Sequence, residues 1–217
     1  AAILYSTNPA LTTRGQDDPC QAAMKLLDEA VAGFGSWEGR FTHSVYSDAE
    51  SYAETEEGKL FIGKGGKMRW EYSAPKGKLA VSDGRTVWLY VADEKRAYKL
   101  KIPPQKYLPV PVRLLLGKTR PSKEFFCAAA SVEKGVVTIE LGFKEKNVAC
   151  RRLEVAVNEN EKTIAGIRYI DEFDNRVEFR FSEGKKNEKP DPAIFSFTPP
   201  PGTRITEEAD GELQGQF

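Results

Sequence analysis

The sequence predicts a mainly β protein: a long, strongly curved antiparallel sheet with small apolar helices lying on it. From residue 36 onward, short runs alternate apolar and polar residues and are separated by Gly, Asn, Asp and Pro, which is typical of strands and turns. The turns between the later runs are short, so consecutive strands are expected to run antiparallel. The length of 217 residues suits a single all-β domain.

The first predicted element is a helix over residues 20–32. Asp18 is a good N-cap, and Pro19 suits the first helical position. Gly33 and Gly35 end the helix. The stripe of apolar residues at helical spacing consists of Ala23, Leu26, Leu27, Ala30 and Val31. This helix is amphipathic and is therefore expected to lie on an apolar surface.

Thirteen strands are predicted after the helix. Their approximate ranges are 37–47, 50–57, 59–64, 67–74, 77–83, 86–92, 95–101, 125–132, 136–143, 148–158, 163–171, 175–183 and 194–198. In one hairpin, Ser82-Asp83-Gly84 supplies the turn, and the following arm, 86–91, is apolar on both faces. Both faces of that arm must therefore be covered, although the sequence leaves open what covers each.

Residues 102–118 interrupt the strands. Prolines break the first half, and Val112 to Gly117 can form a short apolar helix that ends at Gly117. The segment is expected to fold back over the sheet. A curved sheet with two apolar helices can enclose a cavity.

Composition excludes several classes of function. Lys plus Arg and Asp plus Glu both number 32, so no basic field exists to hold nucleic acid or an anionic membrane. No apolar run approaches the roughly 18 residues that cross a bilayer. The spacing of Cys20, Cys127 and Cys150 fits no metal site, so we expect no metal and no cofactor. The sequence predicts buried thiols, and it leaves open the alternative that Cys20 forms one disulfide.

Catalytic constellations are also missing from the sequence. His43 is the one histidine, there is no GxSxG motif, and His43 is predicted to serve on a strand face. Asp83 and Asp171 are available to a lipid hydrolase, but Asp83 precedes a turn glycine, where Asp bonds the backbone. The sequence therefore predicts no enzyme.

Three signatures follow one another with the spacing of a known family. They are GKLFIGKGGKMRWEYSAP (58–75), LAVSDGRTVWLYV (79–91) and IFSFTPPPGTRI (194–205). Together they resemble LolA, the family of periplasmic outer-membrane lipoprotein carriers, over roughly residues 22–205. The resemblance implies an incompletely closed antiparallel β-barrel with small α-helices that form a lid over an apolar cavity.

The same resemblance implies a function and partners. Such carriers accept acylated lipoproteins from the inner-membrane complex LolCDE and pass them to the outer-membrane receptor LolB, without covalent chemistry. We therefore expect a monomer in the periplasm, with its signal peptide removed and no stable membrane insertion. Related lipid or lipoprotein binders of this fold, such as LolB or an RseB-like sensor, are the alternative.

The resemblance also suggests site residues. The family has a cavity-facing Trp at the position of Trp70, and Met68 and Tyr72 share its strand face. An Arg of the family that holds the lid closed is replaced here by Lys64, so the latch falls on Lys64 or Arg69. The remaining residues predicted for the acyl-chain cavity are Phe41, Phe61, Leu79, Val81, Trp88, Tyr90, Leu114 and Leu115.

Three regions are expected along the chain. Residues 1–16 form a mobile lead-in, 17–205 a single LolA-like domain, and 206–217 a disordered tail.

Overall fold

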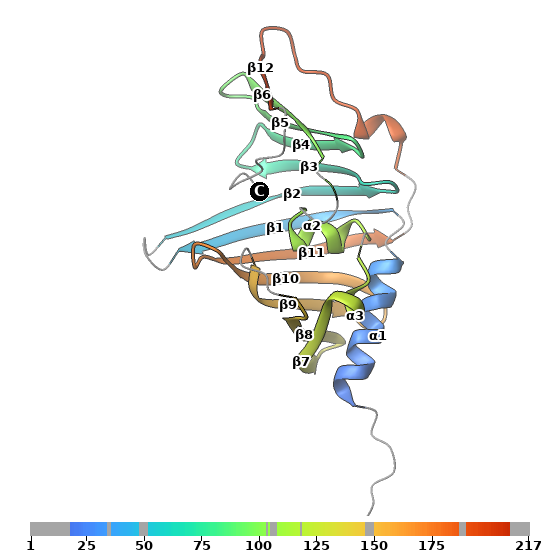
Figure 1. Cartoon of the computed structure of the whole chain (residues 1–217). Helices are drawn as coiled ribbons and strands as arrows, with labels where there is room; N and C mark the ends of the chain where they lie inside the picture. Colours follow the sequence, from blue (N-terminus) through green and yellow to red (C-terminus); the bar gives the residue numbers. More distant parts are fainter. Residues whose placement is uncertain are drawn as a thin grey trace, which may run out of the picture.

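The computed structural model describes residues 18–33, 36–47, 52–102, 104, 108–117, 119–145, 150–186 and 190–208. In this part of the chain, twelve strands form one sheet in the order β12-β6-β5-β4-β3-β2-β1-β11-β10-β9-β8-β7 (Figure 1). Neighbours are antiparallel except β12, which runs parallel to β6. Strands β12 and β7 are the two edges of the sheet, which confirms that the barrel is not closed.

The elements follow the predicted order closely. The helices are α1 (Pro19–Ala32), α2 (Val110–Leu115), α3 (Pro121–Glu124) and the 3-10 helix η2 (Pro192–Phe195). The strands are β1 (Trp37–Ser47), β2 (Tyr52–Gly63), β3 (Lys67–Ala74), β4 (Lys78–Asp83), β5 (Thr86–Val91), β6 (Arg96–Lys101), β7 (Phe125–Glu133), β8 (Val136–Phe143), β9 (Cys150–Asn158), β10 (Thr163–Asp171), β11 (Arg176–Lys186) and β12 (Arg204–Glu208). Among the described helices, none is long and apolar enough to span a bilayer.

Strand β2 corrects the prediction of two strands at 50–57 and 59–64. Gly58 lies inside one continuous strand, opposite Tyr72 of β3. A Cβ atom at Gly58 would come 2.0 Å from the carbonyl oxygen of Glu71 and 2.9 Å from the Phe41 ring. The glycine therefore serves a close backbone approach within the sheet rather than a turn.

The C-terminal part also differs from the prediction. Residues 194–198 form no strand, because Asp191 caps η2 with a hydrogen bond from the Ala193 amide at 2.9 Å and prolines follow. The last strand is instead β12, which pairs with β6. The predicted boundary of the tail at residue 206 thus falls inside a strand, while 209–217 lie outside the described residues.

Helix α1 has the predicted caps. The Asp18 side chain accepts a hydrogen bond from the Cys20 amide at 3.0 Å, and Gly33 ends the helix. Helix α2 begins two residues before its predicted start, with Pro111 in its first turn, and α3 was not predicted. All three helices lie on the same face of the sheet (Figure 1).

A disulfide joins α1 to the edge of the sheet. Cys20 is bonded to Cys127 of β7, with their Cα atoms 5.5 Å apart, and Cys150 is a buried thiol outside this disulfide. Burial raises the pKa of the Cys150 thiol to about 12, so this thiol stays protonated at neutral pH.

Candidate ligand-binding site between the sheet and α2

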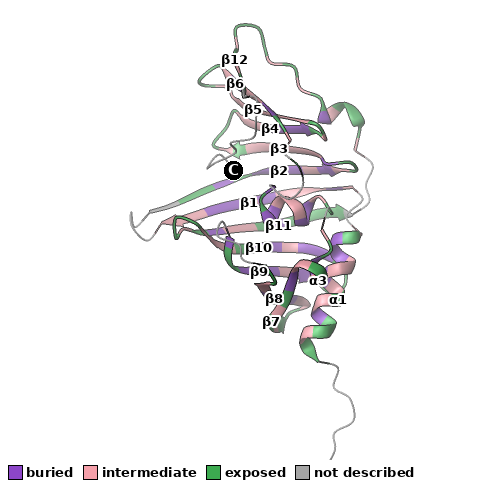
Figure 2. Cartoon of the chain, in the orientation of Figure 1, coloured by how far each residue is buried: buried purple, intermediate pink, exposed green. Residues whose placement is uncertain are grey.

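One face of the sheet is an apolar surface that the helices cover. Leu60, Trp70, Ala80 and Leu89 are direct partners in β2, β3, β4 and β5, and directly paired residues share a face. We call this the inner face and its opposite the outer face. Buried residues run through the central strands and along the helices that cover them (Figure 2).

The floor of the inner face is a chain of aromatic rings. The Phe41 ring centroid lies 4.7 Å from that of Trp70 and 5.1 Å from that of Tyr72. Trp70 lies 6.0 Å from Phe179, and Phe179 lies 6.4 Å from Phe181. Phe41, Trp70 and Tyr72 were predicted from the sequence. Phe179 and Phe181 were not, although the alternation along β11 could have placed both on one face.

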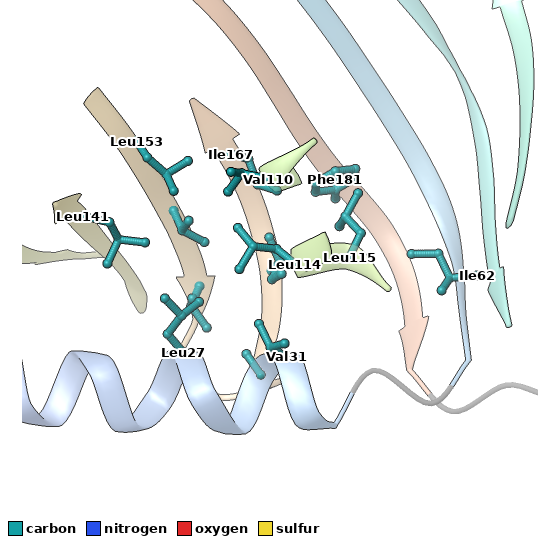
Figure 3. Close-up of a cluster of buried hydrophobic side chains, with 14 of the residues drawn as sticks. Leu27, Val31, Ile62, Val110, Leu114, Leu115, Leu141, Leu153, Ile167 and Phe181 are labelled. Atoms are coloured by element: carbon teal, nitrogen blue, oxygen red, sulfur yellow. The ribbon is translucent and has the colours of Figure 1, made fainter. Parts of the chain in front are cut away.

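Helix α2 packs into this floor. Its apolar side chains Leu114 and Leu115 are almost fully buried in the same core cluster as Phe41 and Trp70. In Figure 3 they point from α2 toward Phe181 and Ile167 of the sheet, and Leu27 and Val31 approach from α1. The two leucines that the sequence assigned to the helix over the cavity therefore lie against the inner face.

A small cavity remains beside α2. It holds about 40 Å³, which is room for only a few water molecules. Its lining is almost wholly apolar and consists of Gly66, Met68, Trp70, Ala80, Val81, Ser82, Val87, Ile102, Leu108, Pro109, Val112 and Leu116. Pockets for drug-sized ligands measure about 300–1,000 Å³, so a large apolar ligand can occupy this cavity only if α2 moves.

Polar contacts hold α2 in place through the other helices. Arg113 of α2 forms an ion pair with Glu124 of α3 at 2.7 Å, and the Thr119 hydroxyl donates to the same carboxylate. Helix α3 is tied to α1 because the Ser122 amide and hydroxyl both donate to Asp28, at 2.9 and 2.5 Å. We call these five residues the helix clamp.

The predicted latch residues do not touch α2. Lys64 is exposed in the turn between β2 and β3. Arg69 points to the outer face, where it donates to the Ile194 carbonyl at 3.0 Å and pairs with Glu71 at 2.6 Å. Arg69 thus fastens η2, and neither Lys64 nor Arg69 belongs to the helix clamp.

Several residues predicted for the cavity belong to the outer face. Trp88 and Tyr90 alternate with Leu89 and pack on Phe197, with ring centroids 5.9 and 5.4 Å away. Leu79 pairs with Tyr90, and Val81 pairs with Trp88. Val81 still borders the cavity, although its side chain alternates away from those of Ala80 and Ser82.

Phe61 likewise alternates away from Leu60 and pairs with Arg69 on the outer face. The arm 86–91 is apolar on both faces because α2 covers its inner face and the segment after η2 covers its outer face. Leu89 and Val87 face the cavity side, whereas Trp88 and Tyr90 lie under the segment that follows η2.

A buried polar group lies at one end of the aromatic floor. His43 Nδ1 lies 3.2 Å from Glu56, and Lys78 Nζ lies 2.7 Å from the same carboxylate. Burial raises the pKa of the Glu56 carboxyl, but the hydrogen bonds from His43 and Lys78 lower it by more, so its pKa lies below the usual value. We call these three residues the polar trio.

The two carboxylates that a hydrolase could use serve turns instead. Asp83 accepts hydrogen bonds from the amides of Arg85 and Thr86, both at 2.7 Å. Asp171 accepts from the amides of Phe173 and Asn175 at 2.9 and 2.8 Å. No group of metal-ligating side chains occurs among the described residues.

An open β-sheet whose apolar inner face is covered by a short helix is an architecture suited to proteins that bind apolar ligands. The sequence profile of the outer membrane lipoprotein carrier protein LolA matches residues 32–198, and the chain therefore belongs to the LolA family. Members of this family are non-enzymatic transport proteins.

Individual relatives agree with this assignment. The chain is 26% identical to an outer-membrane lipoprotein carrier protein of Azotobacter vinelandii, over 96% of each chain. It is also 26% identical to one of Chromobacterium violaceum, over 90% of this chain and 93% of the other. Its fold is similar to that of an uncharacterized conserved protein from Thermus thermophilus, with a TM-score of 0.56, 11% identity, and coverage of 87% and 100% of the two chains.

Proposed function

We propose that this chain is a periplasmic carrier of acylated lipoproteins. It accepts a lipoprotein from an inner-membrane release complex of the LolCDE type, shields the acyl chains between the inner face and α2, and delivers the lipoprotein to an outer-membrane receptor of the LolB type. It works as a monomer and does no covalent chemistry. The observation that carries the proposal is the apolar cavity beside α2, in a chain that belongs to a carrier family.

The energetics of such a carrier favour a helix that moves. Each methylene of an acyl chain costs about 0.8 kcal/mol when it is exposed to water, so the chains need a large apolar surface while they cross the periplasm. The empty protein must bury the same surface, and Leu114 and Leu115 do so here. Loading replaces the contacts of α2 with contacts of the acyl chains, so neither state leaves the inner face exposed.

Extraction of lipoprotein from spheroplasts tests this proposal. The purified protein, added to spheroplasts that hold newly made lipoproteins, is expected to release them as soluble one-to-one complexes. The variant Val112→Glu places a charge in the cavity wall and should reduce release about tenfold or more, because an unpaired charge in an apolar site is costly.

The control is Phe173→Glu, at a residue of the turn between β10 and β11 that is 72% exposed, and it should release lipoprotein normally. Circular dichroism and gel filtration establish that both variants are folded. Lack of release by the wild-type protein, under conditions in which a known carrier succeeds, would overturn the proposal.

A further inference from the structure

The polar trio lies on the inner face, where an apolar carrier surface would be expected to have no charges. Alternation places His43 on the same face of β1 as Phe41, and Glu56 on the same face of β2 as Leu60. Lys78 shares its face of β4 with Ala80. The side chains of His43 and Glu56 are less than 10% exposed.

The histidine has an unused hydrogen-bonding atom. Its ring is stacked on Phe179, with centroids 4.3 Å apart and planes 4° from parallel. His43 Nε2 is buried and has no hydrogen-bond partner among the described residues. A buried polar atom without a partner costs free energy and requires an explanation.

The neighbours of His43 fix which nitrogen carries the proton of the neutral ring. Glu56 is a carboxylate that also pairs with Lys78, and a carboxylate can only accept hydrogen bonds. His43 Nδ1 must therefore carry the proton in the bond to Glu56. In the neutral ring, Nε2 is then a lone pair that accepts a hydrogen bond from an N–H or O–H group.

The aromatic floor connects this atom to the cavity. Phe179, on which His43 stacks, lies 6.0 Å from Trp70, and Trp70 lines the cavity beside α2. A ligand that extends from the cavity along the floor thus meets apolar rings first and the polar trio last. This order matches an amphiphile with an acyl chain and a polar group at the end of that chain.

We propose that His43 Nε2 binds the amide N–H of an N-acylated cargo whose acyl chain lies along the aromatic floor. The inference rests on the proposed function and names the chemical group that the site selects. An ester linkage has no N–H and leaves the lone pair unsatisfied. The site should therefore prefer an amide-linked chain to an ester-linked chain of the same length.

Two probes that differ in one atom test this preference. N-palmitoylglycine methyl ester has the amide, and the palmitoyl ester of methyl glycolate has oxygen in place of the N–H group. Binding to the wild-type protein, measured by titration calorimetry, should favour the amide probe about tenfold, which is the range for one buried hydrogen bond. Equal affinity for the two probes would overturn the inference.

The variant His43→Phe keeps a ring over Phe179 and removes Nε2. It should lose the preference and bind both probes as the wild type binds the ester probe. A variant that retains the preference would contradict the inference, as would one that loses affinity for both probes to the same extent. Failure of the wild type to bind either probe, together with failure to extract lipoprotein, would overturn the proposed function and this inference with it.

A direct measurement on the wild-type protein avoids any effect of the mutation on folding. The chain has one histidine, so the imidazole ¹⁵N spectrum of untagged protein contains one pair of signals. The amide probe should shift the unprotonated Nε2 signal toward that of a hydrogen-bonded nitrogen, and the ester probe should not. A shift of the same size with both probes, or a free ring protonated on Nε2, would contradict the assignment.

Discussion

Glu56 holds the polar trio together, because its carboxylate accepts hydrogen bonds from both His43 and Lys78. None of these contacts could be predicted from local sequence. Glu56 is 13 positions from His43 and 22 from Lys78, and only the register of β1, β2 and β4 brings the three together. The alternation of β1 did place His43 on a strand face, but its burial depends on Phe179 of β11.

The substitution Glu56→Gln tests this role through the pH dependence of stability. At pH 7 it should lower the free energy of unfolding by about 2 kcal/mol, because hydrogen bonds to a charged group contribute about 1.5–3 kcal/mol. The pKa of Glu56 is lowered in the folded protein from 4.5, so this contribution is complete above that pH and is lost as the pH falls through the folded pKa.

Urea unfolding at pH 7 and pH 3 measures the free energy of unfolding of the variant and of the wild type. The difference between the two free energies should be smaller at pH 3 than at pH 7. The neighbouring exposed residue supplies the control Glu57→Gln, which is expected to change stability little at either pH. A difference that stays the same at both values of pH would contradict the pairing of Glu56 as a carboxylate.

At the scale of the elements, the sequence predicted most strands because their alternation and turns are local. The hairpin of β7 and β8, for example, has Lys134 and Gly135 at its turn, both with positive φ, as a two-residue connection requires. It was harder to predict which face of each strand is the inner face. The arm 86–91 is apolar on both sides, and only the position of Phe197 shows which side is the outer one.

The helix clamp was missed for a related reason. The family pattern drew attention to Lys64 and Arg69 near the signature strand, whereas Arg113 and Glu124 lie in the interrupting segment and just after it. Their contact depends on α3, a helix of four residues that has too short a pattern to predict. The sequence thus identified α2 as a covering element but not the contacts that hold it.

Breaking the clamp should open the inner face. The variant Glu124→Ala removes the acceptor of Arg113 and Thr119 and leaves Arg113 without its ion-pair partner, so the closed form loses stability. A loss of about 1.4 kcal/mol raises the population of the open form about tenfold. We expect faster amide hydrogen exchange in α2 and tighter binding of a fluorescent apolar probe.

Arg69→Met provides the matched control, because it releases the Ile194 carbonyl on the outer face. Exchange should then increase in η2 and stay unchanged in α2. If Arg69→Met freed α2 as strongly as Glu124→Ala does, the sequence-based latch would be right and the helix clamp wrong.

At the scale of the whole molecule, two coverings of one sheet have different roles. On the outer face, η2 and Phe197 cover β3, β4 and β5. On the inner face, α2 fills the space beside Trp70 that a ligand would need and leaves a cavity of about 40 Å³ there. The account therefore requires that acyl chains bind on the inner face and displace α2.

Photo-crosslinking tests this central claim most directly. A photoreactive p-benzoylphenylalanine is placed at Met68, which lines the cavity, or at Tyr90, which packs on Phe197 on the opposite face. The protein is then loaded with lipoprotein labelled in its acyl chains and irradiated. We predict a labelled adduct from position 68 and none from position 90. Labelling from position 90 alone, or equal labelling from both, would contradict the assignment of the inner face as the carrier site.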